Sequence, residues 1–149
     1  MIGACAPKNL WKSEPSIKKA SNESFDASIS PIYRFNGYKG FLLNVHNKTS
    51  GNIDIDWSNT FYVHAGDKQG GFWLEGSAYD ASTGSGKTNI VSGNMFSDEI
   101  YPAKLRVLSQ MAAAYVNESM ETGENGVYLT VNVQGKPISE TLTLVFSQE

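Results

Sequence analysis

Residues 127–146, VYLTVNVQGKPISETLTLVF, decide the fold class. Apolar residues alternate with other residues on both sides of the turn-forming sequence QGKP at 134–137. A period of two is typical of strands with one face in the core and the other in solvent. The face expected to be buried consists of Val127, Leu129, Val131, Val133, Leu142, Leu144 and Phe146. The stretch therefore predicts a β-hairpin.

The same alternation occurs upstream in FLLNVHN, residues 41–47, and in NIDIDW, residues 52–57. The sequence NKTSGN between them is rich in turn-forming residues, so we expect the two strands to pair as a hairpin. Their buried positions are expected to be Phe41, Leu43, Val45, Ile53, Ile55 and Trp57.

Two shorter stretches, TFYVHAG and GGFWLEG, lie on either side of the turn-like DKQGG. Their alternation predicts that Phe61, Val63, Phe72 and Leu74 point inward. Many short strands separated by turns are typical of a β-sandwich or a β-barrel.

Two segments fit this pattern less well. Pro31 cannot donate a hydrogen bond to a β-ladder, so residues 28–35 are expected to form an edge strand at best. Residues 103–126 combine the strand-like KLRVL with a helical spacing of apolar residues. We expect a short strand followed by one or two helical turns there; the spacing is set by Leu105, Leu108, Ala112 and Tyr115.

Length and charge limit the class of protein. The 149 residues suit one compact domain, and charged residues make up only 18% of them. The net charge of -3 offers no basic face for nucleic-acid phosphates. No apolar run is long enough to span a bilayer. These properties disfavour nucleic acid as a partner and leave a globular domain.

The single cysteine, Cys5, is informative because of its position. Ile2-Gly3-Ala4-Cys5 resembles the lipobox of bacterial lipoproteins, in which the cysteine carries acyl chains. Only four residues precede it, fewer than the charged and apolar regions of an export signal require. The alternative is a free thiol in a frayed terminus. Polar residues without clear periodicity follow, so we predict a flexible tether over residues 1–25 and a β-domain over 26–149.

Residues 41–105 and 126–146 are similar to a group of small bacterial lipoproteins that have a β-sandwich domain. The shared features are Asn47 and Thr49 before an Ile-x-Ile-x-Trp strand, a Thr60-x-Tyr62-Val63 strand, a glycine-rich hairpin and Ile100-Tyr101-Pro102. The resemblance implies an immunoglobulin-like sandwich, an envelope location and no assigned chemistry. We therefore predict an all-β, immunoglobulin-like antiparallel β-sandwich of about seven to nine strands behind the tether.

The sequence ASTGSGKT, residues 81–88, satisfies a relaxed Walker A pattern. A phosphate-binding loop needs a buried parallel strand before it and a helix after it. The preceding FWLEGSAYD alternates instead, and Ile90, Val91, Gly93 and Pro102 oppose a helix after it. The pattern therefore predicts a loop that binds no nucleotide.

Other groups with catalytic or metal-binding chemistry are scattered. His46 and His64 could bind a metal with Asp54 or Asp56 if their strands were adjacent, but no spacing places two ligands on one element. Solvated histidines and carboxylates are the alternative that we expect. Cys5 is far in sequence from both histidines, and no Gly-x-Ser-x-Gly motif occurs. We predict no cofactor, no metal and no enzymatic activity.

Aromatic side chains are the remaining candidates for binding: Trp57, Trp73, Tyr79 and Tyr101. Trp57 shares the apolar face of its strand and is expected in the core. Trp73 alternates away from its apolar neighbours, so with Tyr79 it is a candidate ligand-binding residue.

The expected function is a non-enzymatic cell-envelope lipoprotein domain that binds or scaffolds an envelope component, a protein or a glycan. Its anchor would be a lipid on Cys5, in the outer membrane, with the domain facing the periplasm or the surface. Without an export signal the location would be cytoplasmic. One alternative is a carbohydrate-binding module with exposed aromatic rings, and another is a nucleotide-binding enzyme.

Overall fold

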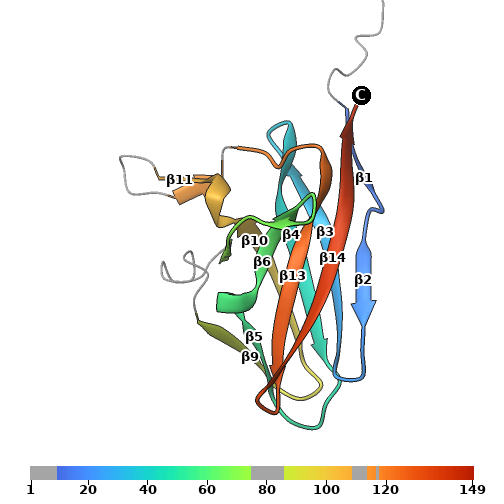
Figure 1. Ribbon diagram of the computed structural model, residues 1–149, viewed down its shortest axis with the longest axis vertical. Coiled ribbons are helices and arrows are strands. Elements are labelled where there is room, and N and C mark those ends of the chain that lie inside the picture. The colour runs from blue at the N-terminus through green and yellow to red at the C-terminus, as the bar shows by residue number, and fades with distance from the viewer. Residues whose placement is uncertain (1–9, 75–85, 109–113, 117) are drawn as a thin grey trace, which may run out of the picture.

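The computed structural model describes residues 10–74, 86–108, 114–116 and 118–149. Two antiparallel β-sheets pack face to face as a β-sandwich (Figure 1). The predicted all-β sandwich is thus confirmed. Its two sheets together have twelve strands in the described part of the chain, more than the predicted seven to nine.

One sheet has seven strands and the other has five. The seven-stranded sheet has the order β1 (Trp11–Glu14), β14 (Lys136–Gln148), β13 (Gly123–Val133), β5 (Ile53–Asp56) and β9 (Lys87–Ile90), with β6 (Phe61–His64) on β13 and β7 (Asp67–Lys68) on β6. The five-stranded sheet has the order β2 (Lys18–Ser21), β3 (Phe25–Arg34), β4 (Gly37–Asn47), β10 (Met95–Pro102) and β8 (Phe72–Leu74).

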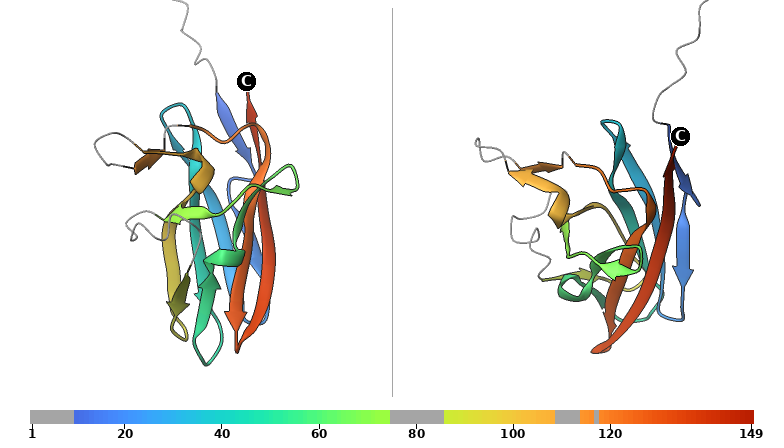
Figure 2. Two further views of the ribbon diagram at one scale, coloured as in Figure 1. Left: turned by 60° about the vertical axis from the view of Figure 1, so that its left-hand side comes forward. Right: turned by 45° about the horizontal axis from the view of Figure 1, so that its top comes forward.

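The hairpin predicted from residues 127–146 is confirmed as β13 and β14. Its register pairs Val133 with Lys136 across a two-residue loop. Gln134 and Gly135 both have positive φ, 52° and 76°, as a type I′ turn requires. This turn matches the right-handed twist of the strands. The β13–β14 hairpin runs along the full length of the sandwich (Figure 2).

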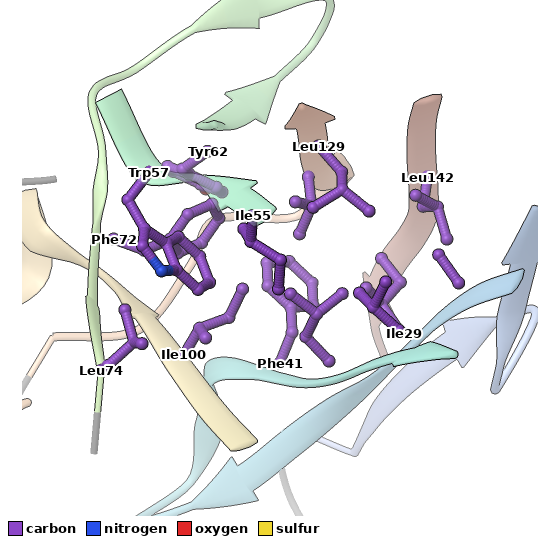
Figure 3. Close-up of a cluster of buried hydrophobic side chains, with 14 of the residues drawn as sticks. Ile29, Phe41, Ile55, Trp57, Tyr62, Phe72, Leu74, Ile100, Leu129 and Leu142 are labelled. Carbon is purple, nitrogen blue, oxygen red and sulfur yellow. The ribbon is translucent and has the colours of Figure 1, made fainter. Parts of the chain in front are cut away.

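The core lies between the two sheets, and the alternation identified most of it correctly (Figure 3). All but one of the inward positions predicted in residues 41–57, 70–76 and 127–146 are buried, and Val133 is half-buried. Trp57 is 3% exposed, so its predicted place in the core is confirmed. Apolar side chains from both sheets therefore meet in one cluster.

The predicted hairpin between residues 41–47 and 52–57 is wrong. Strand β4 pairs with β3 and β10, whereas β5 pairs with β13 and β9 in the other sheet. Asn47, which is fully buried, holds the connection: its Nδ2 donates to the carbonyl oxygens of Gly51 (2.8 Å) and Ile90 (2.9 Å). Its Oδ1 accepts from the Thr49 N–H at 2.8 Å. The chain therefore crosses between sheets, and the two apolar faces meet across the core.

Strand β6 also differs from the prediction. Tyr62, at 3% exposure, joins the core cluster, whereas Phe61 is half-buried against Tyr128, with ring centroids 6.3 Å apart. Val63 is buried but lies outside that cluster. The Tyr62 hydroxyl donates to Asn125, so the phenol is buried without losing its hydrogen bond.

The N-terminal segment is more ordered than a tether. Strand β1 pairs with β14 and β2 pairs with β3, so this part of the predicted tether belongs to both sheets. Trp11 packs edge-on against Tyr38, with ring centroids 5.9 Å apart. The alternating burial of β1 spans only four residues, too few for periodicity to reveal. Cys5 lies outside the described residues.

The two segments that fit the pattern poorly are now defined in part. Strand β2 pairs with β3 only between Asp26 and Ile29, so β3 is an edge strand at Pro31, as predicted. The short strand predicted in KLRVL is confirmed as β11 (Arg106–Leu108), which follows the 3₁₀ turn η3 (Ala103–Leu105). The predicted helical turns are wrong where the chain is described, because β12 (Ala114–Val116) is a strand paired with β11. Residues 109–113 lie outside the described part.

The described residues include no helix that is both long and apolar enough to cross a membrane.

Candidate functional site

The aromatic candidate Trp73 lies on the outer side of the five-stranded sheet. Its neighbours Phe72 and Leu74 are buried in the core, so Trp73 points away from it and is half-buried. The ring packs against Tyr101, its cross-strand neighbour, with centroids 5.6 Å apart and planes 39° apart. Gly40 makes room beneath this pair, because a Cβ there would lie 2.6 Å from a ring carbon of Tyr101.

A charged pair lies beside these two rings. The Arg34 guanidinium donates to both carboxylate oxygens of Glu99 at 3.1 Å and to the Tyr101 hydroxyl at 2.9 Å. The Tyr101 hydroxyl in turn donates to Glu99 Oε1 at 2.6 Å. One nitrogen, Arg34 Nη2, contacts both oxygens of Glu99, while Nη1 contacts Tyr101, and such charge-assisted hydrogen bonds are stronger than neutral ones. This face therefore offers an aromatic ring next to oriented hydrogen-bonding groups, an arrangement that can hold a sugar or a polar peptide.

Sequence reasoning identified only part of this site. The alternation in GGFWLEG predicted that Trp73 leaves the core, and the structure agrees. Tyr79, the second candidate, lies outside the described residues. Arg34 and Glu99 were missed because 65 residues separate them and their contact depends on strand order. No local signal in the sequence could have joined them.

The histidines do not share a site. His46 lies in β4 of the five-stranded sheet, with Nδ1 3.9 Å from Asp26 Oδ2. His64 lies in β6 of the other sheet. Asp54 accepts a hydrogen bond from Asn89 at 3.0 Å. Within the described ranges, no three His, Cys, Asp or Glu side chains gather in a group that could hold a metal ion.

The expectation of a solvated carboxylate is wrong for Asp56, because this residue is only 9% exposed. It accepts from the Ser58 N–H at 3.1 Å and from Asn59 Nδ2 at 2.9 Å, and so caps the 3₁₀ turn η1 (Trp57–Asn59). Burial alone would raise the pKa of Asp56. Hydrogen bonds from Asn59, Asn132 and the Ser58 N–H nevertheless hold this pKa below its ordinary value. The carboxylate therefore positions the turn that carries Trp57.

A polar network next to His64 was not predicted. Asn125 is fully buried and donates from Nδ2 to the carbonyl oxygens of Glu121 (2.7 Å) and Gly123 (3.2 Å). Its Oδ1 must then be the acceptor from both Tyr62 and His64 Nδ1, the latter at 3.0 Å. The hydrogen of this contact therefore lies on His64 Nδ1, while Nε2 lies 3.8 Å from a carboxylate oxygen of Glu121. The network anchors the loop before β13.

Burial, together with the negative charge of Glu121, raises the pKa of Tyr62 to about 12. Between the ordinary value of 10.0 and about 12, the unfolded chain therefore loses the phenol proton before the folded protein does. This contribution to stability is complete below about pH 10 and is lost as the pH rises through about 12. We expect the loss to be about 2 to 3 kcal/mol.

Urea unfolding near pH 9 and near pH 12, in the wild type and in Tyr62→Phe, measures this contribution. The wild type should lose about 2 to 3 kcal/mol more than the variant, which has no phenol to ionise. Equal losses in the two proteins would show that Tyr62 titrates normally.

The Walker-like sequence ends in a strand. Lys87 and Thr88 begin strand β9, which pairs with β5. In a phosphate-binding loop the corresponding residues would instead begin a helix. The Thr88 hydroxyl accepts a hydrogen bond from Trp57 Nε1 at 2.8 Å. Residues 81–85 lie outside the described part. The described end of the motif thus supports a structural role.

No protein-family model, no curated protein and no solved structure matches this chain. The arrangement of Trp73, Arg34 and Glu99 is therefore the feature that indicates a functional site.

Proposed function

We propose that the protein is a non-enzymatic domain of the bacterial cell envelope, an immunoglobulin-like sandwich anchored by lipid on Cys5, which binds or scaffolds an envelope component. The observation that carries the binding role is the half-buried Trp73 ring, which packs on the buried Tyr101 ring beside the Arg34–Glu99 ion pair. Aromatic and arginine side chains are the residues that dominate binding surfaces.

The position of the first strand supports an anchor close to the domain. Six residue steps separate Cys5 from Trp11, where β1 begins, so the chain between them spans at most about 22 Å. A lipid on Cys5 would therefore hold the sandwich near the bilayer. In lipoproteins, an aspartate directly after the cysteine retains the protein in the inner membrane. This chain has Ala6 at that position, so an outer-membrane location is expected.

Expression behind a complete signal peptide in a Gram-negative host tests the anchor. Mass spectrometry of the N-terminal peptide should show acylated Cys5, and the protein should fractionate with the outer membrane. Cys5→Ser is the control and should be soluble in the periplasm. A wild type that is equally soluble and has a free thiol would rule out the lipoprotein role.

A second candidate function is a carbohydrate-binding module, which the half-buried Trp73 ring favours. The ring can stack on the apolar face of a sugar, while Arg34 and Glu99 hydrogen-bond its hydroxyls. A glycan array and a pull-down from envelope extract, each with wild type and Trp73→Ala, separate the candidates.

Glycan binding that Trp73→Ala abolishes would assign the carbohydrate function. A captured envelope protein that Trp73→Ala loses would assign the protein partner. If Trp73→Ala retained every ligand of the wild type, the Trp73 face would not be the binding site. Val91→Ser, an exposed apolar residue in the loop before β10, is the matched control.

A further inference from the structure

The turn between β3 and β4 exposes an aromatic side chain in an unfavourable backbone conformation. Phe35 is 84% exposed, the largest value among the exposed hydrophobic residues of the described chain. Its φ is +51°, in the left-handed region that Gly, Asn and Asp normally occupy and that a bulky residue rarely adopts. Phe35 and Asn36, whose φ is +65°, form a two-residue loop between the paired residues Arg34 and Gly37, and a type I′ turn requires this backbone at both positions. The turn explains the positive φ but not the choice of an exposed phenylalanine, and strained positions of this kind are often functional.

Other apolar residues surround this turn. Tyr33 is 50% exposed and packs edge-on against Tyr38, with ring centroids 5.5 Å apart. Trp11 packs on the same Tyr38 ring from the side of β1. Leu10, 43% exposed, precedes β1, and its carbonyl oxygen accepts from the Glu149 N–H at 3.0 Å. We call Leu10, Tyr33 and Phe35 the apolar tip.

The apolar tip lies at the end of the sandwich where the chain enters. In both figures the β3–β4 turn, the start of β1 and the C-terminus lie at the same end (Figures 1 and 2). Cys5 is only five residues before Leu10, so it can lie no more than about 18 Å from that residue. A lipid on Cys5 would therefore bring this end to the membrane surface.

We propose that the apolar tip inserts into the surface of the lipid bilayer, with Phe35 as the side chain that enters most deeply. The transfer of exposed Phe and Leu side chains out of water has a favourable free energy. Tyrosine favours the interface between headgroups and acyl chains. Two charged side chains that flank the tip, Arg34 and Lys12, are paired with Glu99 and Glu149. Apolar insertion, rather than attraction to anionic lipid, is the binding force.

This contact complements the anchor and would fix the orientation of the domain. Several acyl chains on Cys5 would hold the protein at the bilayer, and the apolar tip would determine which end of the sandwich faces it. With β1 and β14 pointing at the bilayer, the β13–β14 turn is the far end of the sandwich. The Trp73 face is then presented sideways to other envelope components. The inference rests on the proposed function only in placing a lipid on Cys5.

The test uses the only cysteine of the chain and so avoids dependence on acylation in cells. Unacylated protein is coupled through Cys5 to a maleimide lipid in vesicles of phosphatidylethanolamine and phosphatidylglycerol. Spin-labelled lipids then broaden amide resonances near the acyl chains. We expect strong broadening at residues 33–36 and none at Gly135, in the turn at the far end.

The variant that tests the tip is Phe35→Gly. Glycine accepts a positive φ without strain, so this variant should remain folded, with equal or greater stability. It should lose the broadening at 33–36 and, without coupling, bind vesicles about tenfold more weakly than the wild type. Val91→Ser, which alters an exposed apolar residue away from the tip, should change neither measurement.

Two results would overturn the inference. Amides 33–36 that remain unbroadened in the coupled wild type would show that the tip does not reach the bilayer. Self-association in solution that Phe35→Gly abolishes, without lipid contact, would identify the tip as a protein interface. Failure of acylation in cells would remove the anchor but leave the vesicle result unaffected, so the two proposals can fail separately.

Discussion

Trp57→Ala should lower the free energy of unfolding by about 3 to 5 kcal/mol, as expected when a large aromatic ring is removed from a core. The ring is 3% exposed and packs against Phe96, with centroids 5.9 Å apart. Its Nε1–H donates to the Thr88 hydroxyl at 2.8 Å, and its backbone N–H donates to the Gly86 carbonyl at 3.0 Å. The substitution therefore removes core volume and also weakens the attachment of β9.

Urea denaturation of the wild type and the variant measures this loss. Trp73→Ala is the matched control, because it removes the same side chain from a half-buried position outside the core, and its cost should be clearly smaller. A loss below about 1 kcal/mol for Trp57→Ala would mean that the ring is not part of the core.

Gly126→Ala should destabilise the protein by about 3 kcal/mol or more, at or beyond the upper end of the usual cost of overpacking. A Cβ at this position would lie 2.0 Å from the carbonyl oxygen of Leu142 and 2.8 Å from the Cα of Thr143. These are backbone atoms of the paired strand, so no side-chain rotation can relieve the clash. The β13–β14 ladder itself has to shift.

Gly51→Ala is the control for this prediction. No atom lies within 4 Å of a Cβ at Gly51, so its cost should stay within about 0.5 kcal/mol. Thermal and urea melts of both variants make the comparison. If Gly126→Ala were as stable as Gly51→Ala, the close approach of β13 and β14 at this point would be wrong.

The strands and most core positions could be predicted because their signal is local. In residues 127–146 a period of two decides which side chains are buried, whatever the strand's partners are. The same argument identified Phe41, Leu43 and Trp57 as core residues and Trp73 as pointing outward. It failed at β6, where Tyr62 rather than Phe61 enters the core because Asn125 satisfies its hydroxyl.

Strand partners could not be predicted, because they depend on contacts between distant residues. Residues 41–47 and 53–56 are both amphipathic, and their pattern is the same whether they pair side by side or face each other across a core. The side chain of Asn47 stabilises the observed crossing through its hydrogen bond to Ile90, 43 residues away. The contact of Arg34 with Glu99 is hidden from local patterns for the same reason.

The partition of β4 and β5 between two sheets is the central structural claim, since it places the Trp73 face and the far side of the seven-stranded sheet on opposite surfaces. Backbone nuclear Overhauser effects between strands test it most directly. We expect contacts between Ile55 and Val131 and between Val45 and Phe96, as their register requires. A continuous ladder of backbone contacts joining residues 41–47 to residues 53–56 would contradict it.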